Sequence, residues 1–148
     1  MSRLGKFLRL TSSDRLLFVE AAIWLGVARV ALRVMPFRWI ARFLGKHMAE
    51  SPDRISLVKK DIVERVSWGV RTASRHMPWE CKCLAQAIAG KGMFNLRGVR
   101  STLYLGVAKD DGEKLRAHAW LRSGDVFVTG GHRTNQFVVV SSFREHKR

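Results

Sequence analysis

Cys83 and His118 are the two residues of this chain whose types and positions could form a catalytic pair. Cys83 stands at the predicted start of a helix that follows Pro78, where unpaired backbone N–H groups and the helix dipole favour a thiolate. The thiolate is the nucleophilic form of cysteine, and a neighbouring histidine can accept the thiol proton. His118 comes 118 − 83 = 35 residues later, in a predicted strand. This pattern indicates nucleophilic catalysis by a thiol.

Cys81 is the competing nucleophile. Two positions correspond to about 200° around a helix, so the two sulfurs cannot face the same cleft. Cys83 is preferred because Leu84, Ala87 and Ala89 form a small apolar pattern that lets its helix pack closely on a sheet. A CxC pair without a further cysteine or histidine cluster is a weak zinc signal, and it does not suggest a disulfide framework. We therefore expect a reducing compartment, no metal and no cofactor.

The strand around His118 has an apolar row on one face. Side chains alternate across a strand, so His118 points to the opposite face and can lie over the start of the preceding helix. The apolar row consists of Leu115, Ala117, Ala119 and Leu121. Four other histidines are expected at the surface without a chemical role: His47, His76, His132 and His146.

Helices are predicted before Cys83. Apolar residues recur at helical spacing in residues 16–35, 37–44 and 53–76, and residues 47–53 form a loop. In the first helix, Glu20 is expected to pair with an arginine. Arg15, Arg29 and Arg33 share one side of this helix, and the side expected in the core carries Leu16, Ile23, Trp24, Val27, Ala31 and Val34.

Strands are predicted after Cys83. A short helix at residues 83–89 precedes Gly90 and Gly92, and alternation of period two follows. The order of helices and an antiparallel meander predicts an α+β fold. A length of 148 residues fits a single domain, 1–148, with a helical part at 1–76 and a catalytic core at 77–148. The predicted strands are residues 100–108, 115–122, 125–129 and 136–142, with turns at 109–114 and 123–124.

The net charge of 27 − 12 = +15 is spread over the whole chain and favours anionic partners. The basic start is not followed by the apolar region of a signal peptide. The most apolar stretch, residues 21–28, is shorter than the about 20 residues that span a bilayer. We expect a cytoplasmic protein.

Several segments together resemble a known family. They are Pro78-Trp79, CLAQAIA at 83–89, Arg97-Gly98-Val99, LYLGV at 103–107, AHAW at 117–120 and VTGG at 128–131. This combination resembles the leader peptidase of lasso-peptide biosynthesis, a transglutaminase-like cysteine protease, and residues 32–37 resemble the helical leader segment of the same proteins. The resemblance implies N-terminal helices packed on a transglutaminase-like, papain-like core.

The resemblance also implies an activity and partners. The enzyme would remove the leader peptide from a ribosomally made lasso precursor, with Cys83 as nucleophile and His118 as base. The implied partners are the precursor, a separate leader-recognition protein and the macrolactam cyclase. Nucleic acid is not expected as a partner, and membrane attachment is disfavoured because the apolar side of the first helix is needed for the core.

Asp125 is the candidate third catalytic residue, because transglutaminase-like sites use an Asp on the strand after the histidine. If Ser123-Gly124 is a two-residue turn, Arg122 pairs with Asp125 and His118 pairs with Thr129. Asp125 then lies about 13 Å from His118. Thr129, Asn135 or a backbone carbonyl are the alternatives.

Two other functions compete with proteolysis. A transglutaminase-like acyl or amide transferase would use the same pair of residues. A basic nucleic-acid-binding module would keep the cysteines and His118 in its core and would bind with strong salt dependence.

Overall fold

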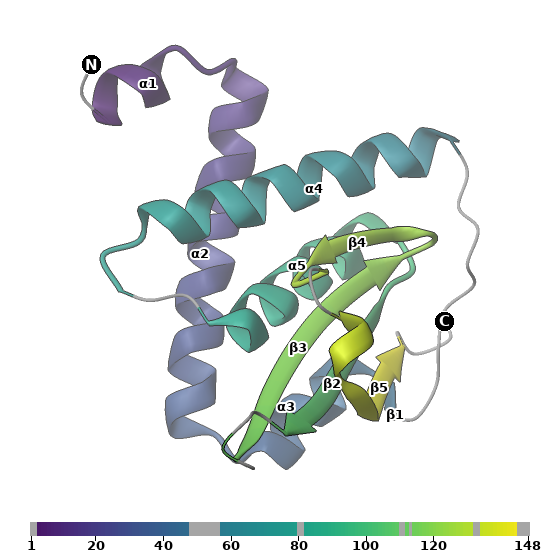
Figure 1. Cartoon of the computed structure of the whole chain (residues 1–148). Helices are drawn as coiled ribbons and strands as arrows, with labels where there is room; N and C mark the ends of the chain where they lie inside the picture. Colours follow the sequence, from purple (N-terminus) through teal and green to yellow (C-terminus); the bar gives the residue numbers. More distant parts are fainter. Residues whose placement is uncertain are drawn as a thin grey trace.

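A computed structural model describes residues 3–47, 57–79, 82–109, 112, 114–131 and 134–144 (Figure 1). In these residues an antiparallel sheet lies beside helices, which confirms the α+β class. The helices are α1 (Arg3–Leu8), α2 (Ser12–Val34), α3 (Phe37–Leu44), α4 (Leu57–His76) and α5 (Cys83–Arg97). The strands are β1 (Lys46–His47), β2 (Thr102–Lys109), β3 (Leu115–Ser123), β4 (Val126–Thr129) and β5 (Val138–Arg144), and a short 3-10 helix, η1 (Thr134–Gln136), precedes β5.

The ends of α2 follow from local chemistry. The Thr11 hydroxyl accepts the backbone N–H of Asp14 at 3.1 Å and caps the first turn, and Pro36 follows two residues after the last helical residue.

The predicted helix at 37–44 is confirmed as α3. The third predicted helix is present from Leu57, while residues 53–56 lie outside the described residues. α1 was not predicted.

The core face of α2 differs from the prediction. The buried side chains are Leu17, Ala21, Leu25 and Ala28. This helix is apolar on two opposite sides, so periodicity alone cannot tell which side meets the rest of the protein. The predicted core residues Leu16, Ile23, Val27 and Val34 are exposed and, with Val19 and Val30, form what we call the outer stripe.

α5 is longer than predicted. Gly90 and Gly92 suggested its end, but the helix continues through both to Arg97 and closes at Gly98, which has a left-handed conformation (φ 66°). A Cβ on Gly90 would lie 2.7 Å from Leu121 of β3, and one on Gly92 would lie 2.5 Å from Trp24 of α2. The two glycines therefore allow close packing instead of ending the helix.

The sheet has the strand order β1-β5-β2-β3-β4, with antiparallel pairs throughout. The predicted meander is wrong for its last strand, because β5 crosses over to pair with β2 instead of β4. His47, which was predicted in a loop, belongs to the short edge strand β1.

The β3–β4 hairpin also has a different register. Ser123 pairs with Val126, so Gly124 and Asp125 are the turn residues. A bulge then pairs Leu121, and not His118, with Thr129. The predicted register was wrong because the turn lies one residue later in the chain than expected, and the bulge then shifts the pairing further.

A single buried cluster joins the helices to one face of the sheet. α5 contacts β2, β3 and β4, while α2 and α4 both pack on α5. Fully buried side chains of this cluster include Leu25, Phe94, Leu103 and Leu121. Within the described ranges, no helix is long and apolar enough to cross a membrane.

Candidate active site

Cys83 is the first residue of α5, as the sequence predicted. Lys82 before it is extended (φ −69°, ψ 162°), and the first hydrogen bond of the helix runs from Gln86 N–H to the Lys82 carbonyl at 3.1 Å. The N–H groups of Cys83, Leu84 and Ala85 therefore precede the helical hydrogen bonds and give this end a partial positive charge. The thiol is half-buried. Cys81 lies outside the described residues.

The thiol meets β3 beside His118. The backbone N–H of Ala119 donates to the Cys83 sulfur, with an N–Sγ distance of 3.4 Å. The β3–β4 pairs stop at Leu121 and Thr129, so the start of α5 reaches β3 beyond the end of β4. The structure therefore brings Cys83 to the residue next to His118 in the chain.

A backbone carbonyl orients the imidazole of His118. The Nε2 atom lies 2.7 Å from the carbonyl oxygen of Gly130, directly after β4. A carbonyl oxygen only accepts hydrogen bonds, so Nε2 carries the hydrogen and Nδ1 is the basic nitrogen of the neutral ring. This tautomer suits a base that removes the proton of a thiol through Nδ1.

Aromatic side chains restrain the ring of His118. Its centroid lies 5.0 Å from that of Phe137 and 5.7 Å from that of Trp120, which in turn stacks on Tyr104. Gly106 is the cross-strand partner of His118. A Cβ at this glycine would lie 2.8 Å from Trp120 and 3.0 Å from Phe137, so its missing side chain leaves room for both aromatic residues.

Asp125 lies at the far end of the same hairpin. It is exposed in the β3–β4 turn, and Ser123 at the start of this turn is five positions along the strand from His118, or about 17 Å. The structure does not bring this carboxylate to the imidazole. A backbone carbonyl was one of the predicted alternatives, and the Gly130-Gly131 pair was the signal that could have located it. Gly130 has a left-handed conformation (φ 64°), which favours glycine.

Trp79 connects the segment before α5 to the first long helix. It is half-buried, and the guanidinium of Arg29 in α2 lies over its ring at 5.3 Å from the centroid. Trp79 is therefore packed against α2. His76 is exposed at the end of α4, and its Nδ1 atom lies 2.8 Å from the Thr72 carbonyl.

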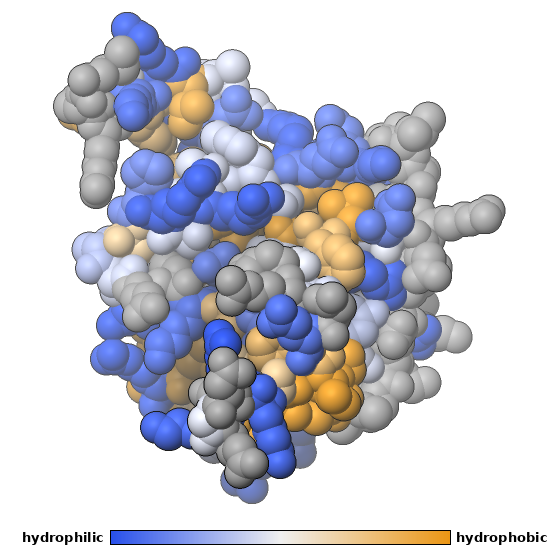
Figure 2. All heavy atoms as spheres, in the orientation of Figure 1, coloured by the Kyte–Doolittle hydropathy of each residue, from blue (hydrophilic) through white to orange (hydrophobic). Residues whose placement is uncertain are grey.

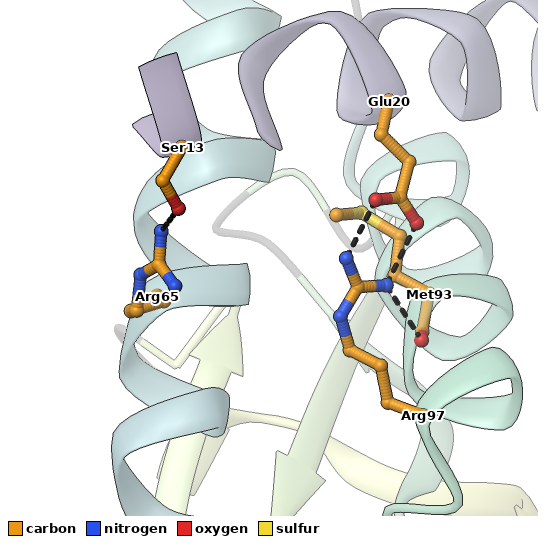
Figure 3. A network of polar contacts seen from close by, with 5 residues as sticks. All are labelled: Ser13, Glu20, Arg65, Met93 and Arg97. Carbon is orange, nitrogen blue, oxygen red and sulfur yellow. Dashed lines mark hydrogen bonds and ion pairs between the residues drawn. The ribbon is translucent and has the colours of Figure 1, made fainter. Parts of the chain in front are cut away.

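Glu20 belongs to a different place in the molecule. Its carboxylate accepts two hydrogen bonds from Arg97, at 2.6 and 2.7 Å, which confirms the predicted arginine partner (Figure 3). These hydrogen bonds raise the pKa of the Arg97 guanidinium above its usual value, against the effect of its partial burial. A hollow of about 210 Å³ lies beside this pair, and neither Cys83 nor His118 lines it.

No group of three or more histidine, cysteine, aspartate or glutamate residues in the described part of the chain could hold a metal ion. Searches of curated proteins and of solved structures found no match. Residues 31–142 match the family model described as the transglutaminase-like superfamily, and this range contains both Cys83 and His118. Since the match covers most of the chain, the protein belongs to the transglutaminase-like superfamily.

Proposed function

We propose that this protein is a cysteine peptidase that removes the leader peptide from a ribosomally made lasso precursor. The observation that carries the proposal is the meeting of Cys83, at the start of α5, with the segment of β3 that holds His118. The superfamily match supports a cysteine hydrolase or transferase. The lasso substrate is inferred from the sequence motifs around Cys83 and His118.

The proposed reaction begins with transfer of the thiol proton to Nδ1 of His118. The Cys83 thiolate attacks the carbonyl carbon at the leader–core junction, and the backbone N–H of Cys83 donates to the resulting oxyanion. His118 then gives its proton to the leaving amine. Water attacks the thioester and loses a proton to His118, which releases the leader carboxylate and regenerates the thiol.

A peptide substrate has an apolar surface available near the imidazole. Phe137 contacts His118, and β5 continues from it into three exposed valines, Val138, Val139 and Val140. Figure 2 shows an apolar patch at the place that β5 occupies in Figure 1. We propose that an apolar part of the precursor rests here.

The central test is incubation of the precursor and the leader-recognition protein with wild-type protein, Cys83→Ala and Cys81→Ala. Mass spectrometry should detect the free leader with wild type and Cys81→Ala, and Cys83→Ala should lower the rate at least about a thousandfold. Iodoacetamide should label Cys83 rapidly near neutral pH. Release of the leader by Cys83→Ala would remove the basis of the proposal.

The superfamily match equally supports acyl or amide transfer as a second candidate. This reaction would use the same thioester but an amine in place of water. The two differ in their products, because hydrolysis adds water and splits the chain, whereas transfer joins the acyl group to an amine. Mass spectrometry with and without a primary amine separates them.

A further inference from the structure

The outer stripe of α2 is an apolar surface that the described residues do not bury. Its six side chains are between 44% and 72% exposed, and they recur every three or four residues from Leu16 to Val34. The eighteen helical steps from Leu16 to Val34 correspond to about 27 Å. A continuous apolar row of this length exceeds the scattered apolar residues of an ordinary surface and marks a contact site.

Most of the outer stripe faces away from the core, while Leu16 at its start also lines the hollow beside Glu20 and Arg97. The core residues of α2 lie on the opposite side of the helix, at Leu17, Ala21, Leu25 and Ala28. Near the first turn of α2, α1 adds two further exposed apolar side chains, Leu4 and Leu8. α1 is joined to α2 by an edge-to-face contact of Phe7 with Phe18, at 5.5 Å between ring centroids.

The segment that contains the outer stripe is strongly basic. Residues 1–47 contain nine lysines and arginines but only two acidic residues, Asp14 and Glu20. Both acidic side chains bond to arginines of other helices: Asp14 bonds to Arg65 at 3.4 Å, and Figure 3 shows that Glu20 bonds to Arg97. On the helix side next to the stripe, Arg33 is exposed and Arg15 is half-buried, while Arg29 lies over the ring of Trp79. The surroundings of the stripe are therefore cationic.

We propose that the outer stripe docks on an anionic lipid bilayer. Its side chains would enter the boundary between headgroups and acyl chains, with α2 in the plane of the surface and the neighbouring arginines at lipid phosphates. Charge complementarity selects this partner over a second copy, because every copy carries +15. The sequence argued against membrane attachment because the core needs an apolar side of α2. In the structure a different apolar side of α2 lies in the core, so the outer stripe stays exposed. The proposal does not depend on the peptidase activity.

The test is sedimentation of the full chain with vesicles of phosphatidylcholine alone or with about a third of phosphatidylglycerol. Wild type should bind the anionic vesicles, and binding should weaken as salt is raised. Ile23→Ser and Val30→Ser should each weaken binding about fivefold or more, because each removes an inserted apolar side chain. Their circular dichroism spectra should match wild type, since both side chains point to solvent.

Leu96→Ser and Arg71→Gln are the matched controls, because Leu96 is 70% exposed on α5 and Arg71 is exposed on α4. Both should bind vesicles like wild type, whereas Arg33→Gln should bind more weakly. Equal loss in control and stripe variants would show general attraction of a basic protein and would overturn the proposal. Vesicle binding at the wild-type level by Ile23→Ser and Val30→Ser would also overturn the proposal. So would a result in which these changes alter the oligomeric state or the binding of a protein partner but leave vesicle binding unchanged.

Discussion

At the scale of single residues, the candidate site is a dyad held by a carbonyl group. The Cys83 sulfur accepts a hydrogen bond from the backbone N–H of Ala119, and Nε2 of His118 lies at hydrogen-bond distance from the carbonyl oxygen of Gly130. A neutral carbonyl sets the tautomer of the imidazole without adding a negative charge, and Phe137 and Trp120 limit the rotation of the ring. The oxygen that a carboxylate would supply in a triad comes here from the backbone.

Gly130→Ala should reduce both stability and peptidase activity. The new Cβ would lie 2.6 Å from the Ala119 carbonyl oxygen and 3.2 Å from Nε2 of His118, in a left-handed backbone conformation. We expect a loss of about 1–3 kcal/mol in the free energy of unfolding. Cleavage should slow more than tenfold at a temperature where the variant is folded, as measured by the rate of leader release. Wild-type kinetics would contradict the role of the Gly130 carbonyl.

Asp125→Asn should leave the cleavage rate within about twofold of wild type, because Asp125 is exposed in the turn beyond Ser123, which already lies about 17 Å along the strand from His118. Leader release under single-turnover conditions measures this rate. His118→Ala provides the positive control and should abolish cleavage. A drop of a hundredfold in Asp125→Asn would restore the aspartate to the site.

At the scale of elements, close packing of α5 determines where its first residue lies. Gly92 faces Trp24 of α2, and Gly90 faces Leu121 of β3. α5 is thus held between a helix and the strand that carries His118. Small residues at these positions bring Cys83 and β3 together.

Gly92→Ala should destabilise the protein by about 1–3 kcal/mol, because its Cβ would overlap the indole of Trp24. Gly26→Ala is the matched control inside α2, where a Cβ meets nothing within 4 Å. This control should stabilise the protein by about 0.5–1 kcal/mol through helix propensity. Urea unfolding monitored by circular dichroism gives both values. Similar stability changes in the two variants would contradict the packing argument.

At the scale of the whole molecule, the helical part and the catalytic core share one interior. α2 and α4 pack on α5, and the hydroxyl of Ser67 in α4 donates to the Val128 carbonyl in β4 at 2.6 Å in a buried position. Removal of residues 1–76 would expose the helix that carries Cys83. The fold of the remaining residues therefore depends on the N-terminal helices.

We expect residues 1–148 to unfold in one cooperative transition. Circular dichroism at 222 nm reports mainly the helices, and fluorescence reports tryptophans of both parts, including Trp24 in α2 and Trp120 in β3. The two signals should give the same urea midpoint within about 0.2 M, because neither part has a core of its own. Two separate midpoints would indicate two domains.

The sequence by itself determined the features that depend on local pattern. The helix start at Cys83, the strand phase of His118, the end of α2 at Pro36 and the α+β class all follow from caps, breakers and periodicity within about twenty residues. Only the tertiary structure decided which apolar side of α2 is buried, where β5 pairs, and that Gly130 faces His118. These outcomes depend on contacts between segments far apart in the chain and on one bulge, and a local pattern carries no information about either.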